Sequence, residues 1–192
     1  IVLGSAMAAF QRNVKRMLAW SGVAHAGTLL VGFVAGTPDA FAAVGFYVSS
    51  SLLATLGAFG VVLALATGGR ESERIDDFAG LGRSRPGLAA CMTLFLLALV
   101  GIPGTAGFWA KWLLFGAAVE AAALPLVVVA LFGTLACLHG TWRVIVMMYV
   151  HEAPEAEPIP ASTSELAVLV LCAAGVLWLG FLPDSLPLGG EG

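Results

Sequence analysis

The sequence has 192 residues, of which 59% are hydrophobic and only 11% charged, and its net charge at pH 7 is −3. Its mean hydropathy is +0.96, whereas soluble domains carry roughly 25% charged residues. This composition excludes an ordinary soluble enzyme. It predicts an all-α, polytopic bundle of transmembrane helices in one membrane domain, with the lipid bilayer and no nucleic acid as a partner.

The chain opens with a short apolar stretch, residues 1–11, which at about 1.5 Å per residue is too short to cross a ~30 Å hydrocarbon core. We interpret it as the end of a span whose earlier part the sequence lacks. Five apolar stretches follow, each near or above the ~20 residues that a crossing needs. They predict spans at about 17–36, 41–67, 88–118, 121–150 and 165–183, and loops on one common side at 12–16, 68–87 and 151–164.

The basic residues are distributed very unevenly between the two sides of these spans. Eight of the nine Lys and Arg residues fall in the three common-side loops or at a span end beside them, namely Arg12, Lys15, Arg16, Arg70, Arg74, Arg83, Arg85 and Arg143. By the positive-inside rule this side is cytoplasmic, and the carboxyl end of the chain lies outside. The ninth basic residue, Lys111, lies inside a predicted span.

The sequence contains no recognisable pattern for a metal or cofactor. The three cysteines, Cys91, Cys137 and Cys172, lie in different spans without metal-ligand spacing, and we interpret them as small packing residues. Gly-rich phosphate loops, nucleophile elbows and His-Glu metal motifs are also absent from the sequence. We therefore expect no metal and no cofactor to bind in this chain.

His25 is a candidate proton carrier in the first full span. Helical spacing places Ser21 and Thr28 on its face. One interpretation is a packing hydrogen bond to a neighbouring helix. The other is that the imidazole, which exchanges protons near neutral pH, acts as a relay in a buried wet path. We favour the relay, because the two hydroxyl side chains could hold water.

Tyr47, Ser51 and Thr55 form a polar stripe at i, i+4 and i+8 on the second span. Hydroxyl residues in membrane helices often form a packing seam between helices. If the stripe instead faces His25 or Lys111, it lines a hydrated channel. The sequence alone does not choose between these two interpretations.

The third span is predicted to break before Lys111. Pro103 has no amide hydrogen for the carbonyl of Leu99, so the helix should kink or unwind at Gly101–Gly104. Carbonyls freed inside a membrane need partners, and such broken helices often line cavities in transporters. A lysine at mid-span costs roughly 2.5–3.5 kcal/mol and indicates an ion or proton path. The alternative is that Lys111 snorkels to the outer interface.

The fourth span carries His139 and Arg143 one turn apart. We expect Arg143 to snorkel towards the cytoplasmic side, with its stem buried and its guanidinium in water. His139 lies deeper and is a supporting candidate for a proton path. Glu120, nine residues after Lys111, is too far along the helix for a direct pair and is expected at the outer interface.

Four ordered segments together resemble the carboxyl-terminal part of subunit N of the proton-translocating NADH:quinone oxidoreductase, respiratory complex I. They are RNVKRMLAWSGVAHAG (12–27), FYVSSSLLATLGAFGVV (46–62), ESERIDDFAGLGRSRP (71–86) and GIPGTAGFWAKWLLF (101–115). The resemblance extends from about residue 1 to residue 183. It implies an antiporter-like bundle with one broken helix and a place in the plasma (inner) membrane of a bacterium.

The resemblance also implies roles for single residues. Lys111 matches the lysine of the broken helix, taken to be the terminal proton carrier near the outer exit. His25 matches a histidine beside the central hydrophilic axis, and Lys15 lies in an Asn-x-Lys-Arg motif at the cytoplasmic end of a helix. The candidate relay residues are thus Lys111 and His25, supported by Pro103, Gly101, Gly104, Ser21, Tyr47, Ser51, Thr55, His139 and Lys15.

The function implied is proton transfer across the membrane, coupled to quinone reduction elsewhere in a complex with other membrane subunits. NADH, FMN, iron–sulfur clusters and quinone would then bind in those other subunits. The chain departs from the family pattern at Trp20 and Thr28, where tyrosine is common, and at Gly104, where a second proline is common. A cation/proton antiporter subunit or a membrane-bound hydrogenase subunit, which share the broken helix, and a structural anchoring bundle remain alternatives.

Overall fold

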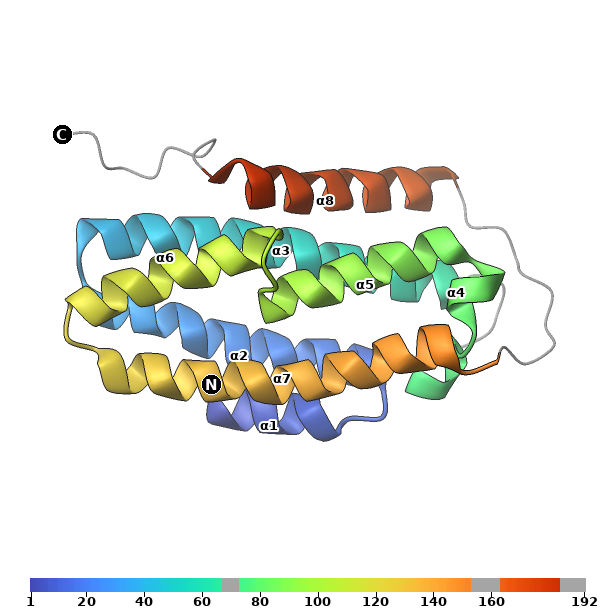
Figure 1. Ribbon diagram of the computed structural model, residues 1–192, viewed down its shortest axis with the longest axis horizontal. Helices are drawn as coiled ribbons and strands as arrows, with labels where there is room; N and C mark the ends of the chain where they lie inside the picture. Colours follow the sequence, from blue (N-terminus) through green and yellow to red (C-terminus); the bar gives the residue numbers. More distant parts are fainter. Residues whose placement is uncertain (67–72, 153–162, 184–192) are drawn as a thin grey trace.

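The computed structural model describes residues 1–66, 73–152 and 163–183, and its regular elements there are helices packed into an elongated bundle (Figure 1). The predicted all-α, antiporter-like fold is confirmed. The elements are α1 (Val2–Phe10), α2 (Val14–Ala35), α3 (Pro38–Ala66), η1 (Ile75–Phe78), α4 (Leu81–Ser84), α5 (Pro86–Val100), α6 (Ala106–Glu120), α7 (Leu124–Val150) and α8 (Thr163–Phe181).

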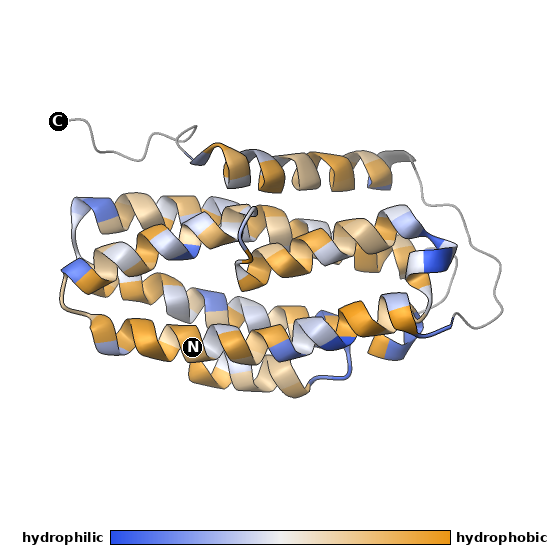
Figure 2. Cartoon of the chain, in the orientation of Figure 1, coloured by the Kyte–Doolittle hydropathy of each residue, from blue (hydrophilic) through white to orange (hydrophobic). Residues whose placement is uncertain are grey.

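Three of the described helices, α2, α3 and α7, are long and apolar enough to cross a membrane. Hydrophobic residues occur along all the labelled long helices (Figure 2). Many large apolar side chains are exposed, including Leu30, Phe132 and Leu171, which are 62%, 68% and 72% exposed. A lipid environment removes the cost of exposing such side chains. The chain is a multi-pass membrane protein.

The helices follow the predicted spans closely. The starts and ends of α2, α3, α7 and α8 lie within three residues of the expected bounds, and the broken span corresponds to the pair α5 and α6. Part of the expected 68–87 loop, with Arg70, and most of the 151–164 loop lie outside the described residues. The number of membrane crossings stays a prediction.

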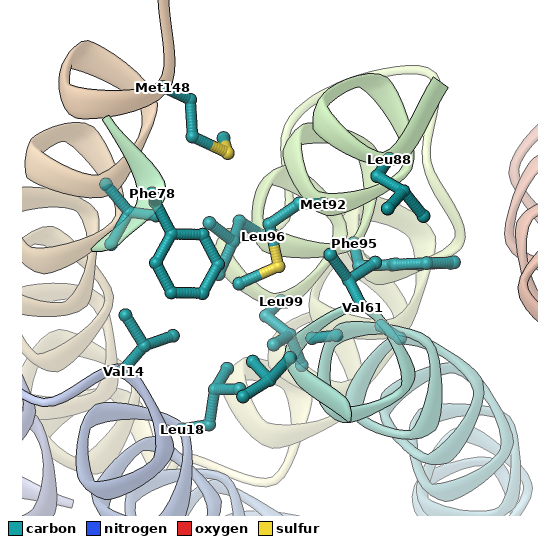
Figure 3. Packing of buried hydrophobic residues seen from close by; sticks show 14 of the residues in the cluster. Val14, Leu18, Val61, Phe78, Leu88, Met92, Phe95, Leu96, Leu99 and Met148 are labelled. Carbon is teal, nitrogen blue, oxygen red and sulfur yellow. The ribbon is translucent and has the colours of Figure 1, made fainter. Parts of the chain in front are cut away.

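The main apolar core lies where α2, α3, α5, α7 and η1 meet (Figure 3). Its largest fully buried side chains include Leu18, Phe78, Phe95 and Met148. A Cβ atom at Gly57 of α3 would overlap the ring of Phe95, so α3 and α5 approach closely there only because position 57 has no side chain. This packing fixes the position of α5 relative to α2 and α3.

The described parts of the three basic loops lie at one end of the bundle. The Val14 amide donates to the carbonyl of Glu73 at 2.7 Å, and the Ile75 amide donates to that of Arg12 at 3.0 Å. At the same end, the Gly80 amide donates to the carbonyl of Met147 on α7 at 3.3 Å. Backbone hydrogen bonds therefore join two of the loops that the sequence places on a common side, and they join the second of these to the end of α7 that leads into the third.

Candidate functional site

The break between α5 and α6 begins with a left-handed glycine. Gly101 has a φ of 88° and Gly104 a φ of 91°, a conformation that glycine adopts without steric cost. The amides of Gly101 and Ile102 both donate to the Leu97 carbonyl, at 2.9 and 3.0 Å. Because Pro103 has no amide hydrogen, the Leu99 carbonyl has no helical donor.

Lys111 supplies the missing hydrogen bonds. Its Nζ donates to the carbonyl oxygens of Leu99 at 3.1 Å and Val100 at 2.6 Å, and to Oγ1 of Thr134 at 3.2 Å. A lysine ammonium has three N–H donors, and all three are used. The charge also lies at the negative end of the α5 dipole. Lys111 is thus directed back into the break and not towards the far end of α6.

A small cavity connects Lys111 to His25. It has a volume of about 10 Å³ and is lined by Lys111, His25, Tyr47, Ser50 and Ser51, together with apolar residues of α5 and α6. A space of this size holds about one water molecule. His25 Nδ1 lies 2.7 Å from the Tyr47 hydroxyl. Two of the three residues in the predicted stripe on α3, Tyr47 and Ser51, therefore line the same cavity as His25 and Lys111.

A second small cavity, of about 20 Å³, is also lined by His25. Its polar lining consists of His25, Ser21, Cys137 and Thr141. His25 thus lines two spaces that each hold about one water. This arrangement could carry a proton from the cavity with Ser21, through the imidazole, to a water in the cavity beside Lys111.

Beyond Lys111 lies a larger groove between α6 and α7. It has a volume of about 560 Å³ and extends from Lys111 and Thr134 to Glu120 at the end of α6, between apolar walls that include Trp112 and Phe115. We call the small cavity that contains His25 and Lys111 the inner cavity. Of the described residues, Lys111 is the one that lines both the inner cavity and the groove. The Lys111 side chain therefore contacts both spaces.

Some predicted residues do not join this site. Thr55 lines neither of the two cavities nor the groove. His139, expected as a supporting residue of a path, has an exposed side chain, because its neighbours Gly140 and Thr141 occupy the inward face of α7. Arg143 does not snorkel freely: its guanidinium donates to the carbonyls of Ala9 and Gln11, at 3.5 and 3.3 Å, and so caps the end of α1.

Sequence reasoning missed four polar residues of the site. Ser50 on α3 is 2% exposed and lines the inner cavity. Thr134, Cys137 and Thr141 of α7 line the groove or the second cavity. Their spacing of i, i+3 and i+7 places them on one helix face, a signal that was present in the sequence. Within the described ranges, no group of three or more His, Cys, Asp and Glu side chains could hold a metal ion.

Lys15 lies away from the site, at the end where the basic loops meet. Its Nζ donates to Oε1 of Glu73 at 2.6 Å, and Asn13 Nδ2 donates to Oε2 of the same carboxylate at 2.9 Å. These hydrogen bonds, with the Lys15 charge, hold the pKa of Glu73 below its ordinary value of 4.5. In this structure Lys15 joins two loops and contacts neither Lys111 nor His25.

Acid is expected to loosen this loop contact. Because the pKa of Glu73 is lowered in the folded chain, its carboxylate stabilises the fold fully above the ordinary value of 4.5, and this contribution is lost as the pH falls below it. We expect the hydrogen-exchange protection of the Val14 amide to fall over that range in the natural protein. A Glu73→Gln variant should lack this pH dependence.

The matched control is Glu152→Gln. Glu152 contacts Arg83 at 3.9 Å, and its side chain is 87% exposed, so its loss should change little. Equal pH dependence in all three proteins would contradict the assigned role of Glu73.

Comparisons with known proteins identify the family. Residues 1–137 match the model for "NADH:quinone oxidoreductase/Mrp antiporter, TM". Subunit N of NADH-quinone oxidoreductase from Halorhodospira halophila is 41% identical over 196 aligned residues, which cover 97% of this chain and 40% of that protein. The chain thus spans about two fifths of the length of this curated relative.

Two solved structures have the same fold. A chain of respiratory complex I from Thermus thermophilus with bound aureothin superposes with a TM-score of 0.81 at 30% identity, over 97% of this chain and 42% of that one. A chain of the Mrp complex from Dietzia sp. DQ12-45-1b gives a TM-score of 0.85 at 19% identity, over 96% and 42%, which is a likeness of fold alone. The chain belongs to the NADH:quinone oxidoreductase/Mrp antiporter family, and its resemblance to subunit N is confirmed.

Proposed function

We propose that this chain forms the outward part of a proton path in subunit N of a proton-translocating NADH:quinone oxidoreductase. Quinone reduction elsewhere in the complex would drive Lys111 to release its proton, and His25 would replace it through the inner cavity. The observation that carries this proposal is that Lys111 lines both the cavity with His25 and the groove between α6 and α7. A proton carrier must have access to both sides in this way.

The arrangement of the proposed complex follows from the same assignment. Other membrane subunits are its partners, and NADH, FMN, iron–sulfur clusters and quinone bind in other subunits. The protein lies in a bacterial plasma (inner) membrane, with the basic loops in the cytoplasm. The positive-inside rule supports this orientation, since the basic loops meet at one end of the bundle.

A Lys111→Ala variant of the assembled complex tests the proposal. We expect NADH oxidation to drive fewer protons per electron into everted membrane vesicles, because among the described residues no other titratable side chain lines both spaces. The measurement is the change in internal pH at a matched rate of NADH oxidation. An unchanged ratio of protons to electrons would contradict the proposal.

The second candidate is a subunit of a cation/proton antiporter, which the likeness to the Mrp complex keeps open. The same vesicles distinguish the two. An antiporter would exchange sodium for protons in the absence of NADH, whereas the respiratory subunit would move protons only while NADH is oxidised. The 41% identity to subunit N favours the respiratory assignment.

A further inference from the structure

We infer that Thr134 of α7 receives the proton that Lys111 releases and passes it to water in the groove between α6 and α7. The inference rests on the proposed function and adds a residue and a direction to it. Thr134 Oγ1 accepts from Lys111 Nζ at 3.2 Å and donates to the carbonyl of Ala130 at 3.0 Å. Among the three hydrogen-bond partners of the ammonium, it is the one with a proton of its own.

The three hydrogen-bond partners of Lys111 can satisfy its side chain both as a charged ammonium and as a neutral amine. The ammonium has three donors for three acceptors: two carbonyls and the Thr134 hydroxyl. A neutral amine has two donors and one lone pair. The Leu99 and Val100 carbonyls can still take the two donors, but they cannot donate to the lone pair. Of these three partners, only the Thr134 hydroxyl can do so, with its O–H bond pointing to Lys111 instead of Ala130.

The position of Thr134 gives the transfer a direction. Both Thr134 and Lys111 line the groove, but only Lys111 also lines the small cavity that contains His25. A proton transferred from Lys111 to Thr134 therefore moves away from the cavity that contains His25. The groove continues from there to Glu120 at the end of α6.

The step conserves atoms and charge. The Thr134 O–H bond first turns from the Ala130 carbonyl to a water molecule in the groove. An Nζ–H bond of Lys111 then breaks as a new O–H bond forms on Thr134, while the original O–H bond breaks and its proton joins that water molecule. Lysine becomes a neutral amine, the threonine is again a neutral hydroxyl, and the water becomes a hydronium ion. The new O–H bond already points to the amine, so the hydroxyl donates to its lone pair. A hydrogen-bonded hydroxyl at this distance is within reach for such a transfer.

Substitution of Thr134 by valine in the assembled complex is the direct test. Valine keeps the branched shape and removes the hydroxyl. We expect the coupled rate of proton translocation to fall by about two- to tenfold, the effect of losing one hydrogen bond in the transfer step, and the number of protons translocated per electron to fall as well. A Thr134→Ser variant should restore both, because it restores the hydroxyl but not the methyl group.

Thr93→Val is the matched control. Thr93 of α5 also donates to the carbonyl four residues before it, Ala89, at 2.8 Å, but it lines neither the cavity nor the groove. The same chemical change there should leave proton translocation unaltered. If Thr134→Val fails to assemble, Thr134→Ala replaces it, because alanine also lacks the hydroxyl and adds no bulk. We expect the same fall in proton translocation for this variant.

The outcomes separate this inference from the proposed function. Loss with valine and rescue with serine support the inference. Wild-type translocation by Thr134→Val, or equal losses with valine and serine, would overturn it, since the hydroxyl would then be unnecessary. Both of these results leave the proposed function standing if Lys111→Ala still lowers translocation. An unaffected Lys111→Ala would overturn the proposed function itself.

Discussion

A Lys111→Arg variant is expected to assemble, to keep the break between α5 and α6 intact, and to lose proton translocation through this site. The guanidinium has more N–H donors than the three acceptors around Lys111 require, so the Leu99 and Val100 carbonyls keep their partners. The groove beside Lys111, about 560 Å³ in volume, has room for the larger head group. Arginine does not release its proton in proteins, so transfer stops.

Lys111→Met separates the structural part of this role from the chemical part. Methionine has a similar length but no donor, and it leaves two carbonyls at the break without partners. We expect a loss of about 1–3 kcal/mol of stability for each such carbonyl that water does not reach. Both variants should fail to translocate protons, but only the methionine variant should lose assembled complex on mild heating, as followed by native electrophoresis.

The comparison between the two variants decides whether Lys111 is more than a helix cap. If arginine supported normal proton translocation in vesicles, the lysine would act only by holding the break together. If methionine and arginine were equally heat-stable, the hydrogen bonds to the carbonyls would contribute nothing measurable. Either result would contradict the dual role that the geometry assigns to Lys111.

The sequence predicted the break but not what fills it. Pro103 alone shows that the Leu99 carbonyl loses its helical donor, and a bilayer requires a replacement. That the replacement is Lys111 depends on how α6 packs against α5, because a lysine on this helix could extend towards either end. The sequence therefore predicts that the Leu99 carbonyl needs a hydrogen-bond donor, but only the packing of α6 against α5 shows that Lys111 is this donor.

The polar stripe on α3 was predicted in part, for a geometric reason. An α-helix turns about 100° per residue, so positions i and i+8 differ by about 80° around its axis. Tyr47 and Ser51 face His25 and Lys111, but Thr55 has turned away and lies two turns beyond Tyr47. The role of Thr134 could not be predicted from the sequence, because a threonine that donates to the carbonyl four residues before it is common in membrane helices.

Gly107→Ala is expected to disrupt the site although it changes no polar group. A Cβ atom on Gly107 would overlap the backbone oxygen of Ala98, which is part of α5 and is 2% exposed. Backbone atoms in a packed core cannot move aside cheaply, and overpacking of this kind costs about 1–3 kcal/mol or more. The start of α6 would have to move away from α5.

Such a displacement would reach Lys111 one turn later on the same helix. Its bonds to Leu99 and Val100, 3.1 and 2.6 Å long, depend on α6 lying close to the end of α5. Gly107 also lines the cavity of about 10 Å³ between Lys111 and His25, where a shift would remove or enlarge the one-water space. We therefore expect Gly107→Ala to lower both heat stability and proton translocation per electron.

Gly116→Ala provides the control within the same helix. A Cβ atom at Gly116 would meet nothing within 4 Å, and alanine is favoured over glycine in a helix by up to about 1 kcal/mol. This variant should be as stable as the natural protein or slightly more so. Gly116 lines the groove, but one methyl group in a space of about 560 Å³ leaves it open, so translocation should be unchanged. The two glycines differ in their neighbours, since only Gly107 faces the backbone of Ala98. If both variants behaved alike in heat-stability and vesicle assays, the close approach of α5 and α6 at Ala98 would not be needed for stability or translocation.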